Sequence, residues 1–285
     1  MNTPIFVIGS QRSGTTLLCR MLSAHPDIFI KNELPMINSI LVSEKTRETI
    51  LEELESAIGK HYGAPLNEFL KKHGKSKWGV KDPLFTYFLN CLAKHFSDSK
   101  FIVIIRDGRA VTNSNMKAWW GVATNAYSGA NLWKKEVALQ AEFAKLMGEK
   151  CITLKYESLL ENTEGELKRI CLFLEVPFAE KMMYYFESDG FINRNKMNEN
   201  VFRAVDSSLG DKWRIELTSY QIGVIENIAG EILEKYGYEL AGKKVEISTI
   251  KKRYFDLHQK IIGELQLQWQ LKVKGLMKSW KMPRT

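Results

Sequence analysis

The stretch PIFVIGSQRSGTTLLCRML, residues 4–22, decides the fold. The apolar run IFVI predicts a short buried strand that ends at Gly9, and the apolar residues after Gly14 recur at the spacing of a helix. Strand, glycine-containing loop and helix, in this order, are typical of a phosphate-binding loop, where backbone N–H groups and the start of the helix attract an anion. We therefore expect a phosphate-bearing ligand at this loop.

The octet GSQRSGTT, residues 9–16, departs from the loop of nucleoside triphosphatases. Thr15 occupies the position of their lysine, and Arg12 places a fixed positive charge three residues earlier. Because the lysine that grips the outer phosphates is missing, the loop favours a ligand with one phosphate on the loop and a second anionic group beside it, such as a phosphosulfate. A general nucleotide-binding or anion-binding loop is the alternative.

Four more strand-like runs follow the first one and alternate with helical segments. They are DIFIKNE at 27–33, WGVKDP at 78–83, KFIVIIRDG at 100–108 and CITLK at 151–155, the last followed by an expected turn at YESLL. Alternation of this kind predicts βαβ units. We expect an α/β fold of the P-loop-like class, with a mostly parallel sheet covered by helices on both faces and a C-terminal amphipathic helical extension.

The net charge of +8 is concentrated at the C-terminal end of the chain. Residues 243–285 hold 11 Lys and Arg against 3 Asp and Glu, which leaves 30 of each sign in residues 1–242. We therefore expect one domain over 1–242 and a basic amphipathic tail over 243–285. A basic region confined to the tail does not predict nucleic-acid binding by the domain, and we expect no nucleic-acid partner.

Composition also bears on compartment and metal content. No apolar run approaches the roughly 20 residues needed to cross a bilayer, and the first residues lack the basic region and the cleavage site of a signal peptide. The four cysteines have no metal-binding spacing. We expect a cytoplasmic protein without a bound metal, with a peripheral place at the membrane surface as an option for the tail.

Five separated parts of the chain carry a resemblance to a known family. They are PIFVIGSQRSGTTLLCRMLSAHP at 4–26, KDP at 81–83, FIVIIRDGRAVTNS at 101–114, KYESLL at 155–160, and KW at 212–213 followed by YGYE at 236–239. In this order they resemble the PAPS-dependent sulfotransferases, and are most similar to the branch that contains tyrosylprotein sulfotransferases and many bacterial sulfotransferases. The resemblance implies that the chain transfers a sulfuryl group from PAPS to an acceptor hydroxyl and releases PAP.

The resemblance also implies which residues bind the nucleotide. Arg106 follows a buried strand, so its guanidinium is expected at the carboxyl edge of the sheet, and a salt bridge to Asp107 is the alternative. Tyr156 resembles a nucleotide-contacting tyrosine, and a tyrosine that only packs in the core is the alternative. The residues mapped onto the cofactor site are Arg12, Ser13, Gly14, Thr15 and Thr16 for the 5′-phosphosulfate, Arg106 and Ser114 for the 3′-phosphate, and Tyr156 and Ser207, or its neighbour Ser208, for further contacts.

Three residues are candidates for catalysis. Glu33 follows the second expected strand and resembles the glutamate base of the family, which takes the proton of the acceptor hydroxyl. Arg12 and Lys81 are the expected stabilisers of the anionic oxygens. The alternatives are a solvated Glu33 at the start of a helix and a surface ion pair between Lys81 and Asp82.

The acceptor is open between two classes. A hydroxyl on a saccharide or lipid-linked glycan is our first expectation, because a membrane-seeking tail without a secretory address suits cytoplasmic assembly of surface glycans. A tyrosine hydroxyl in a peptide or protein is the alternative that the resemblance favours. An ATP-dependent small-molecule kinase would need the missing loop lysine, and a non-catalytic scaffold is the remaining option.

The tail predicts a long helix with one apolar stripe. A basic amphipathic helix with tryptophans in its stripe is typical of a helix that lies on an anionic membrane surface. Packing of the same stripe on the chain's own domain, or on a second subunit in a homodimer, is the alternative. From Ile250 the stripe residues follow one another by three or four positions, namely Tyr254, Leu257, Ile261, Leu265, Trp269, Val273, Leu276 and Trp280.

Overall fold

The computed structural model describes residues 3–34, 36–41, 44–118, 120–188, 191, 199–242 and 245–280, with side chains up to Lys272. The chain forms two compact units. The sheet unit comprises Met1–Arg106 and Glu136–Leu209, and the helical unit comprises Asp107–Lys135 and Gly210–Thr285. The long C-terminal helix thus belongs to the helical unit, and a domain boundary at residue 242 stays a prediction.

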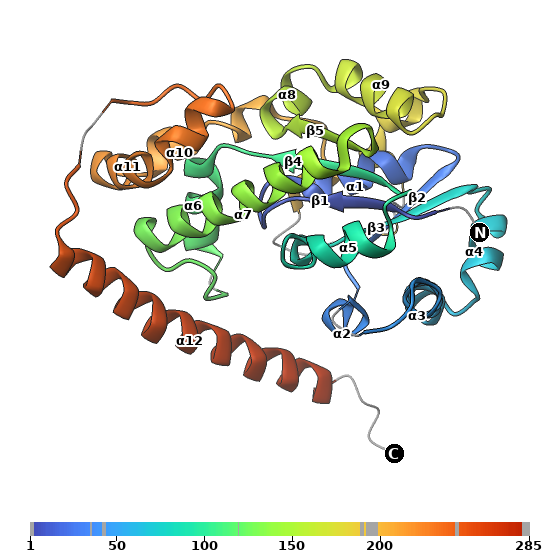
Figure 1. The fold of residues 1–285 in the computed structure, drawn as a ribbon, viewed down its shortest axis with the longest axis horizontal. Helices are drawn as coiled ribbons and strands as arrows, with labels where there is room; N and C mark the ends of the chain where they lie inside the picture. Colours follow the sequence, from blue (N-terminus) through green and yellow to red (C-terminus); the bar gives the residue numbers. More distant parts are fainter. Residues whose placement is uncertain are drawn as a thin grey trace. The chain divides into compact units, whose positions relative to one another are not determined.

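The sheet unit is built on five parallel strands in the order β2-β3-β1-β4-β5 (Figure 1). The expected α/β fold with a parallel sheet is confirmed. β1 is central, with Val7 opposite both Lys81 and Ile102. Because all strands run in one direction, the residues that follow them meet at one edge, the carboxyl edge. The strands are β1 (Ile5–Ile8), β2 (Ile28–Asn32), β3 (Lys77–Lys81), β4 (Lys100–Ile105) and β5 (Cys151–Lys155).

Helices cover both faces of this sheet. They are α1 (Thr15–Ala24), α2 (Ile37–Leu41), α3 (Arg47–Tyr62), α4 (Leu66–Lys72), α5 (Leu89–His95), α7 (Ala126–Met147), α8 (Tyr156–Glu161) and α9 (Thr163–Phe173), of which α7 is shared between the units. Ile5 and Val7 face the core formed with α1, α8 and α9. Phe6 points the other way and stacks on Phe101, with 5.5 Å between ring centroids, and Phe101 meets Phe143 of α7 edge to face.

The segment YESLL, expected to form a turn, is helix α8 instead. Leu159 and Leu160 are buried, and no glycine or proline interrupts the segment. Residues 63–65 separate α3 from α4. Short 3₁₀ turns connect the remaining parts, namely η1 (Pro83–Tyr87), η2 (Gly148–Lys150), η3 (Glu180–Met182), η4 (Tyr185–Glu187), η5 (Glu199–Phe202) and η6 (Ser207–Leu209).

The helical unit has its own small apolar core. Its helices are α6 (Gly108–Lys117), α10 (Trp213–Glu216), α11 (Ser219–Lys235) and α12 (Thr249–Trp280). Ala110 of α6 packs with Trp213 of α10 and with Val224 and Ile225 of α11. In the part of the chain that the structure describes, no helix combines the length and the apolar character needed to cross a bilayer.

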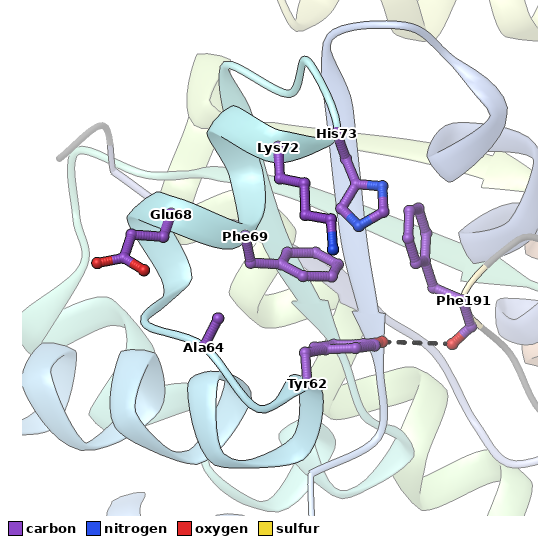
Figure 2. Close-up of a pocket in the computed structure, with 7 residues that line it drawn as sticks. All are labelled: Tyr62, Ala64, Glu68, Phe69, Lys72, His73 and Phe191. Atoms are coloured by element: carbon purple, nitrogen blue, oxygen red, sulfur yellow. Dashed lines mark hydrogen bonds between the residues drawn. The ribbon is translucent and has the colours of Figure 1, made fainter.

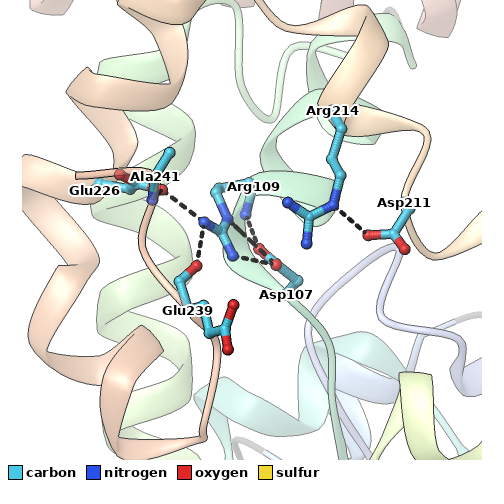
Figure 3. Close-up of polar contacts among 7 residues, drawn as sticks. All are labelled: Asp107, Arg109, Asp211, Arg214, Glu226, Glu239 and Ala241. Carbon is cyan, nitrogen blue, oxygen red and sulfur yellow. Dashed lines mark hydrogen bonds and ion pairs between the residues drawn. The ribbon is translucent and has the colours of Figure 1, made fainter. Parts of the chain in front are cut away.

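Arg109 is buried in the helical unit and joins three of its segments (Figure 3). Its guanidinium binds the carboxylate of Asp107, with Nη2 2.7 Å from Oδ2, and also donates to Glu226 Oε1 at 2.6 Å and to the Glu239 carbonyl at 2.8 Å. The same guanidinium lies 4.1 Å from the centre of the Trp213 ring. A buried charge with carboxylate partners therefore fixes the start of α6 against α11.

We predict that Arg109→Met lowers the free energy of unfolding by about 3–5 kcal/mol, because it leaves two buried carboxylates without their cation. The matched control is Arg214→Met. Arg214 lies 4.6 Å from the same Trp213 ring, but its ion pair with Asp211 is exposed, so about 0–1 kcal/mol is expected. Urea denaturation of both variants measures the difference, and equal losses would contradict the structural role of Arg109.

Candidate active site

The loop between β1 and α1 is fixed by left-handed backbone turns and by its own hydrogen bonds. The φ angle is 69° at Arg12 and 95° at Gly14. Between them, Ser13 donates both its N–H, at 3.1 Å, and its hydroxyl, at 2.7 Å, to the Ser10 carbonyl. α1 begins directly afterwards at Thr15, which is buried. The loop therefore has the strand, turn and helix start that the sequence predicted.

Gly14 lies against the ring of Tyr156, the first residue of α8. A Cβ atom at residue 14 would overlap the edge of that ring, and the positive φ angle there also disfavours a side chain. The Tyr156 ring is buried in the apolar core. Its contact with a nucleotide stays a prediction.

Lys81 brings together the end of β3, the end of β2 and the start of α1. Its ammonium lies 2.8 Å from Glu33 Oε1 and 3.2 Å from Thr16 Oγ1. The Lys81 side chain is 1% exposed, whereas that of Glu33 is 56% exposed. Glu33 is thus an accessible carboxylate bound to a buried cation. Because Lys81 is buried, it does not form the surface pair with Asp82 that was the alternative.

The backbone at Glu33 is held in an unusual turn by β3 and the residue after it. The φ angle of Glu33 is 54°, a conformation that residues other than glycine rarely adopt, and its N–H donates to the Lys81 carbonyl at 2.7 Å. Asp82 accepts the N–H groups of Leu34, at 3.4 Å, and Leu84, at 3.0 Å. Burial raises the pKa of the Asp82 carboxyl. Asp82 is therefore a positioning residue that sequence reasoning missed, although its place before a proline is typical of a helix cap.

Arg106 leaves β4 at the carboxyl edge and reaches the loop. It donates to the Arg12 carbonyl at 3.0 Å and to the Leu209 carbonyl at 2.9 Å. Burial and the nearby Arg106 guanidinium lower the pKa of Arg12. The positive charge of Arg106 beside the partly buried Arg12 guanidinium makes a place where an anion is favoured. Asp107, the alternative partner of Arg106, is ion-paired with Arg109 in the helical unit.

The late serine segment lies next to Arg106. The Leu209 carbonyl, at the end of η6, accepts the bond from Arg106. Ser208 donates its hydroxyl to Asp206 Oδ1 at 2.6 Å and its N–H to the same oxygen at 3.0 Å. Ser207 starts the turn and is exposed. The segment is thus beside the loop of the sheet unit, and the choice between the two serines stays a prediction.

Ser114 lies in α6, the helix whose start is capped by the Asp107 side chain. The residue is half-buried. Because α6 belongs to the helical unit and Arg106 to the sheet unit, the pairing of Ser114 with Arg106 at a 3′-phosphate also stays a prediction.

A separate aromatic pocket of about 510 Å³ lies beside α3 and α4 (Figure 2). The rings of Tyr62 and Phe69 stack in it at 4.3 Å, and both contact Phe29, the second residue of β2. The pocket thus lies near the amino end of β2, away from Glu33, and includes none of the predicted site residues. It is lined by Tyr62, Ala64, Glu68, Phe69, Lys72, His73 and Phe191.

Positive charge at the carboxyl edge comes from Arg12, Lys81 and Arg106. Within the described ranges of the chain, His, Cys, Asp and Glu side chains do not form a group of three that could hold a metal ion. The fixed cations are of the kind that binds phosphate and sulfate oxygens, and Arg12 and Lys81 flank the start of α1.

Residues 4–180 match the model of the sulfotransferase family. Among sequence relatives, protein-tyrosine sulfotransferase 1 of Danio rerio is 30% identical over 230 residues, which are 73% of this chain and 65% of that protein. The match therefore spans slightly less than two thirds of that relative.

Two solved structures share the fold. The sulfotransferase domain from the curacin biosynthetic pathway superimposes with a TM-score of 0.61 at 22% identity, covering 84% of this chain and 99% of that one. A mouse sulfotransferase solved in complex with PAP gives a TM-score of 0.54 at 16% identity, covering 82% of this chain and 88% of that one.

We predict that Gly14→Ala lowers the free energy of unfolding by about 1–3 kcal/mol more than Gly74→Ala does, because its new methyl group overlaps the Tyr156 ring. Gly74 is a matched control: its φ angle is 67°, and a Cβ atom there meets nothing within 4 Å. Both variants carry the same kind of backbone strain, about 1–2 kcal/mol. Urea denaturation tests the difference, and a Gly14→Ala variant as stable as the control would show that the loop does not pack on α8 as described.

Proposed function

The chain belongs to the sulfotransferase family, and from that premise we propose that it transfers a sulfuryl group from PAPS to the hydroxyl of a tyrosine in a protein or peptide. The observation that carries the proposal is the contact of Glu33 and Thr16 with one buried ammonium, that of Lys81. This contact puts a proton acceptor, Glu33, and a cation, Lys81, next to the start of α1.

The cations of the loop fit a donor with more than one anionic group. Arg12 and Arg106 are close enough that the charge of one lowers the pKa of the other. A nucleotide with a 5′-phosphosulfate and a 3′-phosphate supplies anions that relieve this repulsion. The mouse sulfotransferase solved with PAP shares the fold, which supports this choice of donor.

We assign the nucleotide contacts as the sequence predicted. Thr15, Thr16 and the backbone of the loop hold the 5′ end, while Arg106 and Ser114 hold the 3′-phosphate. Because the Ser208 hydroxyl already donates to Asp206, Ser207 is the late serine that we assign to the nucleotide.

In the proposed reaction Glu33 accepts the proton of the acceptor hydroxyl as the acceptor oxygen bonds to sulfur. PAPS supplies the sulfuryl group, whose bond to the 5′-phosphate oxygen breaks in the same transfer. Once Glu33 is neutral, its attraction for Lys81 falls, and the ammonium of Lys81 stabilises the sulfuryl and leaving phosphate oxygens. Arg12 adds a second positive charge from the loop.

The proposed acceptor differs from our first expectation of a saccharide or lipid-linked glycan. The zebrafish relative is named a protein-tyrosine sulfotransferase, which supports the tyrosine alternative. The chemistry agrees, because a phenol with a pKa of about 10 is more acidic than an alcohol hydroxyl and gives its proton more readily to a carboxylate.

The acceptor is tested by a transfer assay with labelled PAPS and three acceptors. These are a tyrosine-containing peptide, the same peptide with phenylalanine in place of tyrosine, and an oligosaccharide. We expect label in the tyrosine peptide alone. Label in the oligosaccharide alone would refute the proposed acceptor and restore the first expectation.

The donor is tested separately by thermal shift with PAP and with ATP and magnesium. PAP is expected to raise the melting temperature, because it binds the folded loop and not the unfolded chain. Stabilisation by ATP with magnesium but not by PAP would overturn the donor and favour a kinase.

We predict that Glu33→Gln lowers kcat by about 100-fold or more, because an amide cannot take the acceptor proton, while PAP affinity is retained. Glu175→Gln is the matched control. Glu175 also has a positive φ angle, 57°, and pairs with a lysine, Lys100, at 2.9 Å, but Lys100 starts β4 at the opposite edge of the sheet. Steady-state kinetics and PAP titration test both variants, and equal kcat values for the two would eliminate Glu33 as the base.

A further inference from the structure

The face of α12 that packs on the helical unit is largely polar. Gln259 accepts the N–H of Thr124 at 2.8 Å and donates to the Gly121 carbonyl at 2.7 Å. Gln266 accepts the N–H of Gly121 at 3.2 Å. Gly121 and Gly263 approach so closely that a Cβ atom on either would press on the carbonyl oxygen of the other. Hydrogen bonds to one loop and a close backbone contact therefore anchor α12.

Further contacts fix the rotation of α12 about its axis. His258 Nδ1 lies 2.9 Å from the Thr124 hydroxyl, and Asn125 donates to the Phe255 carbonyl at 3.0 Å. The Phe255 ring stacks on that of Tyr127 at 5.7 Å. These partners all lie between α6 and the first turn of α7, and Figure 1 shows α12 as one long helix. The side of α12 that carries Phe255, Gln259 and Gln266 thus faces its own unit.

The apolar stripe predicted from the sequence lies on a different side of α12 and is exposed. Tyr254, Leu257, Ile261 and Leu265 are displaced by one or two positions from Phe255, Gln259 or Gln266, which rotates them by roughly 100–200° around a helix. Large apolar side chains exposed along a continuous line mark an interaction surface. The exposed fractions are 61% for Tyr254, 56% for Leu257, 50% for Ile261, 61% for Leu265 and 66% for Trp269.

Positive charge accompanies the exposed stripe. Between residues 249 and 272 the helix has five Lys or Arg against one Asp and one Glu, whereas residues 1–242 carry equal numbers of both signs. The basic residues Arg253, Lys260 and Lys272 are exposed on the same helix. The surface that would bind the stripe is therefore both apolar and negatively charged.

We propose that the exposed stripe of α12, defined by Tyr254, Leu257, Ile261, Leu265 and Trp269, binds the surface of an anionic phospholipid bilayer. The apolar side chains enter the boundary between headgroups and acyl chains, and the Lys and Arg side chains bind lipid phosphates. Tyr254 and Trp269 suit that boundary because each combines an apolar ring with a polar group. The helix lies along the surface and does not cross the bilayer.

The charge of α12 decides between a bilayer and a second copy of the chain. Two copies joined through this stripe would bring two basic helices side by side, which costs free energy through repulsion of like charges. An anionic bilayer has the opposite charge. α12 already packs on its own unit through the side that carries Gln259, so the stripe is not needed for this packing.

The test uses the full chain and sedimentation with phosphatidylcholine vesicles, prepared with and without phosphatidylglycerol. We expect binding to the anionic vesicles that weakens as salt is raised, because screening reduces the attraction of Lys and Arg to lipid phosphate. The double variant Ile261→Gln with Leu265→Gln should bind at least about tenfold more weakly, since two apolar side chains no longer leave water. Its melting temperature should equal that of the unchanged protein, because both side chains are exposed.

The matched control is Leu172→Gln with Ile215→Gln, which removes one leucine and one isoleucine that are 80% and 88% exposed elsewhere. This control should bind vesicles as the unchanged protein does. Equal weakening in both double variants, or equal binding to vesicles with and without phosphatidylglycerol, would overturn the proposal. The proposal would also be overturned if the unchanged protein did not bind vesicles and light scattering showed it to be a dimer, with the Ile261→Gln and Leu265→Gln variant a monomer.

Discussion

A buried ammonium must have oxygen partners, and the site is organised by this requirement at Lys81. The lysine ends β3, which lies between β2 and β1 in the sheet. Its partners therefore come from both neighbours: Glu33 follows β2, and Thr16 lies in the helix that follows β1. Leaving the buried ammonium of Lys81 unpaired would cost free energy, so its pairing holds the base candidate and the phosphate loop in one arrangement.

Arginines serve two different purposes in this chain, and their partners distinguish them. Arg109 is bound by the carboxylates of Asp107 and Glu226, which neutralise its charge and make it part of the core. Arg106 donates to the carbonyls of Arg12 and Leu209, which hold its guanidinium beside the loop. The two residues lie three positions apart in the same motif, RDGR, so their roles depend on which oxygens the fold supplies.

Helix α12 reverses the usual arrangement of an amphipathic helix. In most surface helices the apolar side packs on the protein and the polar side faces water. Here Gln259 and Gln266 bond to the loop between α6 and α7, and Leu257, Ile261 and Leu265 face outward. In this orientation the glutamine side chains bond to the loop, and the apolar side faces away from it.

The sequence was enough to predict the class of fold and the strand, loop and helix start around Gly14. The apolar runs ending at Gly9, Lys81 and Arg106 predicted parallel strands, and the shared carboxyl edge followed from their direction. The spacing of GSQRSGTT predicted an anion-binding loop, because the effects of glycines and of a helix start are local. YESLL could not be assigned correctly, because burial of Leu159 and Leu160 outweighs its weak local preference.

The tertiary structure alone decided which charges meet. Residues 33, 81 and 16 are far apart in the chain, so the contacts of Lys81 with Glu33 and Thr16 depend on strand order. The hydrogen bond from the Leu34 N–H to Asp82, next to Glu33, could not be predicted from the sequence either. The same holds for the exposure of the α12 stripe to solvent. Periodicity shows that a helix has an apolar side, but only long-range hydrogen bonds determine what that side faces.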